Sequence, residues 1–342
     1  MQASTTKPSR LSGWTIIDFC AIAIAVILLV TFILMPSQRA KNTIYPPALR
    51  PGDKIAVISP SGPVDSTAVD SAMTVLRELG FNPVCYPHAL GRNGHFSGSH
   101  DERLADLRMA FSDPDVRAIL CARGGYGAVH SLDTLRSLPL EKDPKWVIGF
   151  SDISALHALM QSKGIASVHA SMAKHIALGA DDIDNAALLD ILRGKFPTYT
   201  FSSNPLNHIG KAEGILLGGN LAVLQALIGT DMDIFAKEKT ILFIEDVSEP
   251  IYKVERQLYQ LRLMGVFDRI SGLIIGQFTE YKPDDNHETM EQMIAEALAP
   301  YPNLPVAFNV PVGHVDHNVP MVEGAYATLD ITPTTVTLKI EK

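Results

Sequence analysis

Residues 146–153 have the sequence WVIGFSDI, in which an apolar run ends at a serine and an aspartate. The run over residues 146–150 predicts a buried strand, and the apolar periodicity of residues 153–161 predicts a helix directly after it. A serine on such a strand-to-helix turn is lifted above the sheet edge, where N–H groups of the helix start can face developing negative charge. We therefore expect a nucleophile elbow with Ser151 at its tip, although Ile153 stands where Gly-x-Ser-x-Gly has its second glycine.

The alternative is that Ser151 or Asp152 only caps the helix. A glycine-rich turn after the preceding predicted strand bears on this choice, because residues 123–127 have the sequence RGGYG. This turn lacks the Lys-Ser/Thr pair of a phosphate-binding loop and the spacing of a dinucleotide fingerprint. Its glycines still allow close backbone approach to a ligand at the carboxyl ends of parallel strands, and a plain tight turn is the other interpretation.

Strand and helix patterns alternate along most of the chain. Strands are expected at residues 54–59, 82–86, 118–121, 213–217, 240–244, 272–276, 306–310 and 327–340. Helices are expected at residues 68–79, 101–111, 129–135, 221–228, 252–264 and 288–298. This alternation predicts an α/β fold with largely parallel sheets that are covered by helices on both faces.

Four segments are expected from these patterns. Residues 45–175 form an N-terminal, Rossmann-like parallel-sheet domain that carries the nucleophile elbow. Residues 176–209, which are rich in Pro, Ser and Asn toward their end, form a linker region. Residues 210–342 form a smaller, strand-rich α/β domain with the candidate acid and base, and residues 1–44 form an N-terminal tail and anchor.

The N-terminal segment is apolar enough to span a membrane. Residues 19–35 carry no charge, and extension to residues 14–35 adds only Asp18. Because a span needs about 20 apolar residues, we expect one transmembrane helix over residues 14–35, in a bacterial inner membrane. A cleaved signal peptide is the alternative, but the run is long and no A-x-A site follows it. Basic residues on both sides leave the orientation open, and the short basic tail before a large domain favours the periplasmic or extracellular side.

The composition excludes several classes of function. The chain has 342 residues, enough for about two domains, and a formal net charge of -8. No basic footprint is present, so we expect no nucleic-acid partner. The three cysteines form no CxxC pair, which excludes a disulfide-dense scaffold and a zinc ribbon; they are Cys20, Cys85 and Cys121.

Acids and histidines in the C-terminal half complete a set of reactive groups. Glu245 and Asp246 end an apolar strand, where one acid could hold an imidazolium or both could be a solvated pair. His314 and His317 lie in the loop PVGHVDHN, but no third metal ligand has suitable spacing, so we expect no metal. Ser151 with an acid and a loop histidine supplies the hydroxyl, base and orienting acid that acyl transfer requires.

Several motifs occur together in one order. They are PPALRPGDKIAVISPSGPV at residues 46–64, RGGYG at 123–127, GFSDIS at 149–154, GGNLAVLQALIGT at 218–230, LFIEDVSEP at 242–250 and PVGH at 311–314. Over residues 45–342 the chain therefore resembles the LD-carboxypeptidase family of serine peptidases. That family includes murein tetrapeptide carboxypeptidases and the microcin-immunity peptidases.

The resemblance implies a site between two α/β domains, usually in a homodimer, without a cofactor or metal. The implied roles are nucleophile for Ser151, triad acid for Glu245, base for His314, and backbone oxyanion donors for Asp152 and for Gly124 or Gly125. Two features depart from the family pattern: Val315 follows the loop histidine where glycine is expected, and murein-recycling members are typically cytoplasmic, without an N-terminal anchor.

The implied reaction is hydrolysis of an L,D-peptide bond that releases terminal D-Ala from murein tetrapeptide, in cell-wall recycling or remodelling. A microcin-immunity-like hydrolase of peptidyl- or aminoacyl-nucleotides would use the same three side chains with a different pocket. A non-catalytic murein-binding module is the third alternative. The presence of Ser151, Glu245 and His314 together argues against it, because a binding protein has no chemical need for all three.

Overall fold

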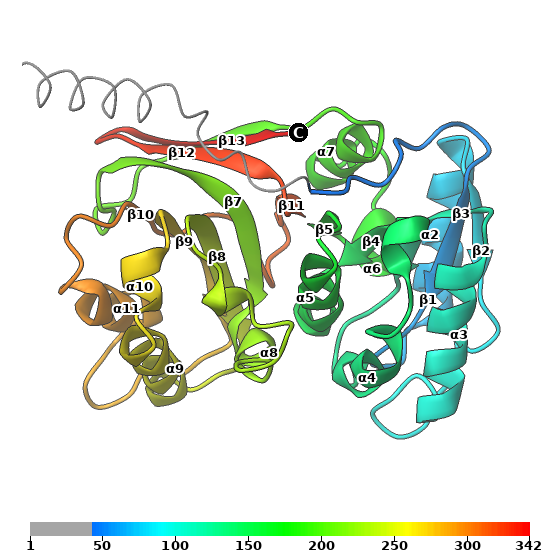
Figure 1. Cartoon of the computed structure of the whole chain (residues 1–342), viewed down its shortest axis with the longest axis horizontal. Coiled ribbons are helices and arrows are strands. Elements are labelled where there is room, and N and C mark those ends of the chain that lie inside the picture. The colour runs from blue at the N-terminus through cyan, green and yellow to red at the C-terminus, as the bar shows by residue number, and fades with distance from the viewer. Residues whose placement is uncertain (1–42) are drawn as a thin grey trace, which may run out of the picture. The chain divides into compact units, whose positions relative to one another are not determined.

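Two β-sheets and their covering helices make up residues 43–342, the part of the chain that the structure, a computed structural model, describes (Figure 1). The first sheet holds six strands, namely β1 (Lys54–Ile58), β2 (Asn82–Cys85), β3 (Val116–Cys121), β4 (Trp146–Gly149), β5 (Ser167–His169) and β11 (Met321–Glu323). Their order is β11-β5-β4-β3-β1-β2. All neighbours are parallel except β11, which runs antiparallel to β5.

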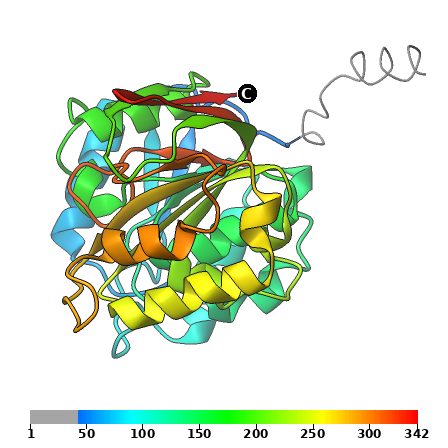
Figure 2. The ribbon, with the colours of Figure 1, turned by 90° about the vertical axis from the view of Figure 1, so that its left-hand side faces the viewer.

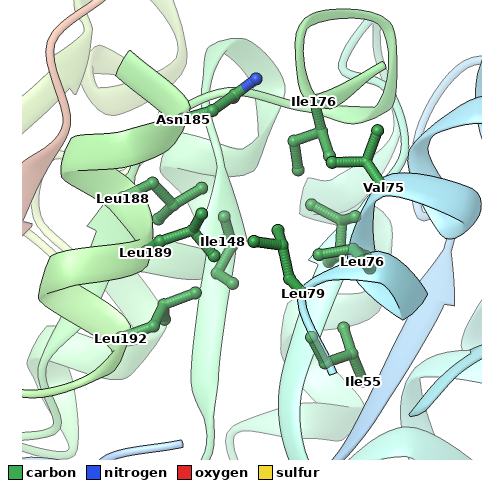
Figure 3. A pocket seen from close by; sticks show the side chains of 11 residues that line it. Ile55, Val75, Leu76, Leu79, Ile148, Ile176, Asn185, Leu188, Leu189 and Leu192 are labelled. Carbon is green, nitrogen blue, oxygen red and sulfur yellow. The ribbon is translucent and has the colours of Figure 1, made fainter. Parts of the chain in front are cut away.

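The helices of this half connect the parallel strands, as the alternating pattern predicts. They are α2 (Ser66–Glu78), α3 (His100–Ser112), α4 (Leu132–Leu135), α5 (Ser154–Ser162), α6 (Ala173–Ile176) and α7 (Ile183–Leu192). Side chains of α2 and α7 converge over β1 and β4 in Figure 3, which labels Leu76, Leu189, Ile55 and Ile148 among them. The cavity between these side chains measures only about 20 Å³, so this face of the sheet is well packed.

The second sheet holds seven strands, namely β6 (Thr198–Ser202), β7 (Gly210–Asn220), β8 (Thr240–Val247), β9 (Gly272–Thr279), β10 (Val306–Ala307), β12 (Tyr326–Ile331) and β13 (Thr335–Glu341). Their order is β10-β9-β8-β7-β12-β13-β6, in which β7 to β10 are parallel and the remaining pairs are antiparallel. The helices are α8 (Leu221–Gln225), α9 (Ile251–Leu263), α10 (Val266–Arg269) and α11 (Met290–Leu298). Figure 2 shows α9 and α11 side by side over one face of this sheet.

The alternation of side chains along β8 explains where its acid points. Leu242 and Ile244 pack in the apolar cluster that contains α9 and α11. Ile241 and Phe243 pack in the cluster that contains β5 and β11 of the first sheet. Because successive side chains face opposite sides of a strand, Glu245 follows Phe243 toward the first sheet. A register shift between β8 and β9 falls at this residue, a position where bulges often redirect a side chain.

The predicted α/β architecture with parallel sheets is confirmed, and three short strands were not predicted. β5 and β11 have three residues each, too few to show an alternating pattern. β6 lies within the segment that the sequence assigned to a linker. β11 comes from the C-terminal stretch, yet it pairs with β5 of the first sheet, so the two sheets are joined by a pairing that no local pattern indicates.

The membrane prediction needs a correction. The transmembrane helix expected over residues 14–35 lies outside the described residues. Within residues 43–342, no helix combines the length and the apolar character that crossing a bilayer requires. The architecture supported by the structure is therefore the α/β fold alone, and the predicted single-pass membrane location and membrane partner are withdrawn.

Candidate active site

Ser151 stands at the tip of a sharp turn between β4 and α5. β4 ends at Gly149, Phe150 is extended, and a short 3₁₀ turn over Ser151–Ile153 leads into the helix. The φ angle of Ser151 is 67°, in the left-handed region that side chains other than glycine rarely adopt. Strained serines of this kind occur at nucleophile elbows, where the turn exposes the hydroxyl above the sheet.

Three side chains that are far apart in sequence form one hydrogen-bonded chain. His314 Nε2 lies 3.0 Å from Ser151 Oγ, which places the serine hydroxyl to donate to the imidazole. On the other side of the ring, Nδ1 lies 2.7 Å from Oε2 of Glu245 and donates to it. The serine follows β4, the acid lies in β8, and the histidine lies in the loop between β10 and β11. The structure therefore brings the three candidate residues together, with the imidazole between the serine and the acid.

The acid and the imidazole perturb each other's protonation. Burial raises the pKa of the fully buried Glu245, but interactions with His169 and His314 outweigh burial, so the net pKa is lowered. Burial lowers the pKa of His314, but the hydrogen bond and charge of Glu245 outweigh this effect, and the net pKa lies above 6.5. An ionised Glu245 therefore holds the Nδ1–H of His314 and stabilises its protonated form.

The loop that carries the imidazole is fixed by its neighbours. Gly313 has φ of 123°, and a Cβ at this position would lie 2.7 Å from Glu245 Oε2, so only glycine allows this approach. Its N–H donates to the side chain of Asn318. Asp184 of α7 accepts from the backbone N–H of Asn318 at 2.7 Å and pairs with His317 at 2.9 Å. His317 is thus an anchor of the loop rather than a partner of the predicted base.

The glycine-rich turn lies directly against the nucleophile. A Cβ on Gly124 would lie 2.8 Å from Ser151 Cβ and 2.9 Å from its Oγ. The carbonyl of Gly124 accepts from the N–H of Gly62, which ties the turn to the loop after β1. Within the described chain, the N–H groups of Gly124 and Gly125 donate to no other group. They are therefore available to a ligand beside Ser151.

The carboxylate of Asp152 has a structural role that the sequence did not indicate. It accepts from Ser61 Oγ at 2.6 Å and from the N–H of Ala128 at 2.8 Å, so it joins the loops after β1 and β3 to the elbow. Arg103, which is itself buried, donates to backbone carbonyls of the same two loops. Burial raises the pKa of Asp152, and these donors oppose that shift.

The end of β7 is docked onto the elbow helix. The N–H of Asn220 donates to Ser154 Oγ at 2.9 Å, and a Cβ on Gly219 would lie 2.4 Å from the same oxygen. The Asn220 side chain caps α8 and donates to Asp246. Asp246 also accepts from backbone N–H groups, and burial raises its pKa to about 6. The acid that contacts the imidazole is thus Glu245, whereas Asp246 hydrogen-bonds the end of β7 and the start of α8.

A cavity of about 340 Å³ opens beside the serine. It is lined from both halves of the chain by Gly125, Tyr126, Val129, Ser151, Asp152, Asn220, Ala222, Val223, Ala226, Asp246, Val247 and Glu249. Such a volume suits a small ligand. Within residues 43–342 no group of three or more His, Cys, Asp or Glu side chains is arranged to hold a metal ion.

Comparison with known proteins identifies the family. Residues 55–170 match the LD-carboxypeptidase N-terminal domain, and residues 213–329 match the LD-carboxypeptidase C-terminal domain. The murein tetrapeptide carboxypeptidase of Pseudomonas aeruginosa is 30% identical over 291 residues, which cover 81% of this chain and 93% of that protein. The chain belongs to the LD-carboxypeptidase family. As a member, it is a serine carboxypeptidase, a hydrolase of peptide bonds.

Solved structures share the fold of this LD-carboxypeptidase. The muramoyltetrapeptide carboxypeptidase of Oxalobacter formigenes superimposes with a TM-score of 0.74 at 28% identity, over 84% of this chain and 99% of that one. The microcin C7 self-immunity protein MccF in complex with aspartyl sulfamoyl adenosine gives a TM-score of 0.75 at 23% identity, over 88% of this chain and 99% of that one. The second likeness concerns the fold alone.

Proposed function

We propose that the protein releases the terminal D-Ala of murein tetrapeptide by hydrolysing an L,D-peptide bond, with Ser151, His314 and Glu245 as a catalytic triad. The observation that carries this proposal is the continuous hydrogen-bonded chain from Ser151 Oγ through the imidazole to Glu245. The relatives named above, whose names specify murein tetrapeptide or muramoyltetrapeptide, support the substrate. The biological role that we propose is cell-wall recycling or remodelling.

The first half of the reaction acylates the serine. His314 Nε2 takes the proton of Ser151 Oγ while that oxygen forms a bond to a carbonyl carbon of the substrate. This carbonyl belongs to the L-centre of meso-diaminopimelate, the residue that precedes the terminal D-Ala. Glu245 stabilises the imidazolium that results and holds its Nδ1–H in place. When the tetrahedral intermediate collapses, the C–N bond breaks and the imidazolium gives its proton to the departing amine of D-Ala.

The second half regenerates the enzyme. A water molecule gives one proton to His314 Nε2, and its oxygen attacks the ester that links the shortened peptide to Ser151. Collapse of this intermediate breaks the bond to Ser151 Oγ, returns the proton from His314 to that oxygen and frees the peptide as a carboxylic acid, which then loses its proton to solvent. We assign the oxyanion of both intermediates to the backbone N–H of Asp152 and to that of Gly124 or Gly125. Loss of one such donor typically costs about 100- to 1,000-fold in turnover.

A substrate panel tests the proposal. The full-length protein is incubated with L-Ala-γ-D-Glu-meso-diaminopimelate-D-Ala, and released D-Ala is measured beside a Ser151→Ala variant with the same thermal stability. We expect D-Ala release from the wild type only. A parallel incubation with aspartyl sulfamoyl adenosine tests the microcin-immunity alternative. Cleavage of that compound without D-Ala release would replace the proposed substrate while keeping the triad.

A fluorophosphonate probe separates an enzyme from a binding module. An activated Ser151 forms a covalent adduct with such a probe, and a module that only binds murein does not. We expect one adduct per chain, located at Ser151 by peptide mapping. A folded protein that binds the tetrapeptide without labelling would contradict the triad. Homodimer formation stays a prediction, which light scattering of the purified protein measures.

A further inference from the structure

His169, the last residue of β5, lies beside the triad acid without taking part in the steps above. Its side chain is fully buried, as is that of Glu245. His169 Nε2 lies 3.9 Å from Oε1 of Glu245, the oxygen that does not contact His314. Among the described residues, neither ring nitrogen of His169 makes a hydrogen bond, and Oε1 of Glu245 accepts none.

Buried polar atoms that lack partners cost free energy, so this pairing needs an explanation. The two unpartnered atoms, a ring nitrogen and a carboxylate oxygen, lie 3.9 Å apart and are complementary as donor and acceptor. An approach of about 1 Å brings the 3.9 Å separation to the ordinary N–H···O length of about 2.9 Å. A hydrogen bond between them would satisfy the buried nitrogen and the buried oxygen together.

Aromatic rings hold the imidazole in this orientation. The His169 ring meets the edge of Phe243 at 5.2 Å between centroids, with an interplanar angle of 84°. On another side it packs against Phe150 at 5.8 Å. Phe150 also contacts the ring of His314 at 5.0 Å, so one aromatic side chain supports both imidazoles.

Asp246 and His157, two of the other ionisable groups around this pair, are engaged elsewhere. Asp246 accepts three hydrogen bonds, one each from residues of β7, α8 and β8. The nitrogens of His157 contact Ser167 Oγ and the carbonyl of Gly149, each at 2.9 Å. Four ionisable groups surround Glu245, His169 and His314. His157 of α5 packs against His169, and Glu323 of β11 lies next to His157. Asp246 of β8 lies near Glu245 and His314, and Glu280, which follows β9, lies near His314. None of these four supplies a donor to Glu245 Oε1 within the described structure.

We propose that His169 is a positioning residue whose Nε2–H donates to Oε1 of Glu245 and fixes the plane in which Oε2 receives the Nδ1–H of His314. This inference rests on the proposed function only for its kinetic consequences. The carboxylate then has one imidazole on each oxygen, and its rotation about the terminal bond is blocked from both sides. The triad is extended by one group to Ser151–His314–Glu245–His169.

The direction of the effect follows from the charge on Glu245. A donor on Oε1 stabilises the carboxylate and makes it a weaker acceptor for the His314 proton. Without that donor the carboxylate holds the imidazolium of His314 more strongly, and Glu245 itself takes up a proton more readily. Both changes inactivate the base at a higher pH than in the wild type. The acidic limb of the pH profile of kcat/KM therefore moves upward when His169 loses its donor.

Two substitutions separate this role from packing. His169→Phe keeps a ring and removes the donor, and His169→Gln keeps an N–H donor and removes the ring. Profiles of kcat/KM against pH are measured for both, with thermal unfolding to verify the fold. We expect His169→Phe to lose about 10-fold at the plateau and to move the acidic limb up by about 1 pH unit. We expect His169→Gln to keep the limb near its wild-type position.

The matched control is His157→Gln, which alters a buried histidine of the same layer that does not contact Glu245. We expect it to leave the acidic limb in place. A folded His169→Phe with the wild-type limb, or a His169→Gln whose limb moves as far as that of His169→Phe, would overturn the proposal.

The tautomer of His169 in the wild type gives a readout that needs no turnover and no folded His169→Phe variant. In ¹⁵N-histidine spectra of the full-length protein, assigned with His169→Gln, we expect the proton of the neutral ring on Nε2. A proton on Nδ1 with a bare Nε2 would refute the hydrogen bond. Failure of the wild type to release D-Ala would instead refute the proposed function and leave this measurement valid.

Discussion

Replacing Gly124 with alanine would test how closely the glycine-rich turn must approach the nucleophile. The added Cβ would lie 2.8 Å from Ser151 Cβ and 2.9 Å from its Oγ. Carbon atoms in ordinary contact are about 3.5 Å apart, so the turn and the serine have to separate by about 0.7 Å. Gly124 does not have a positive φ, so alanine meets no backbone strain there.

The magnitude follows from the hydrogen bond that the movement stretches. The 3.0 Å contact between Ser151 Oγ and His314 Nε2 lengthens beyond hydrogen-bonding range if the serine moves by that amount. A 1 Å misplacement can cost about 100-fold, so we expect kcat/KM to fall about 10- to 100-fold. The overpacking costs about 1–3 kcal/mol of stability, which a protein with about 5–15 kcal/mol withstands.

The assay is D-Ala release from the murein tetrapeptide, with the thermal midpoint measured on the same samples. Gly210→Ala is the matched control, because its Cβ would meet only the ring of Pro305, at the end of β7 opposite Asn220. We expect this control to keep the wild-type kcat/KM. A folded Gly124→Ala enzyme with wild-type kcat/KM would show that the turn need not touch the nucleophile, and the reasoning from its geometry would fail.

Two further predictions concern the acid and the base. Glu245→Gln replaces the acceptor of the His314 Nδ1–H with an amide and favours the wrong tautomer of the imidazole, so we expect kcat to fall about 10,000-fold while the protein stays folded. Steady-state turnover measures this loss, and circular dichroism of the same samples verifies the fold. A loss below tenfold would exclude Glu245 as the triad acid. Because the pKa of His314 is raised, its neutral form is depleted as the pH falls through a value above 6.5. We therefore expect kcat/KM to decline on the acidic side with an apparent pKa above 6.5. A profile that stays flat down to pH 5 would mean that His314 is not the base.

Local sequence singles out the three side chains that the structure brings together, because each one belongs to a strand end or a compact motif. The apolar run before Ser151, its immediate helix and the glycines of residues 123–127 together indicate an elbow with an open approach. Glu245 is likewise marked by the apolar strand before it. The structure adds two geometric facts that the sequence pattern does not contain, namely the positive φ of Ser151 and the close approach of Gly124 to the Ser151 side chain.

The groups that hold the site in place depend on contacts between distant segments. Asp184 reaches the histidine loop across more than a hundred residues of sequence, at His317 and Asn318. β5 is a three-residue strand whose position is fixed by its pairing with β4 and β11. His169 is the last residue of this strand, and no pattern in the residues around it predicts a contact with Glu245. Such residues become visible only when the two sheets are packed together.

D-Ala release from the murein tetrapeptide by wild-type protein and by Ser151→Ala tests the central claim most directly. Both proteins are measured at full length, at one pH above 7, with equal thermal stability as the condition for comparison. The account predicts release by the wild type and a loss of about a million-fold, in practice to background, in the variant. Release by Ser151→Ala at a rate near that of the wild type would contradict the triad and the mechanism built on it.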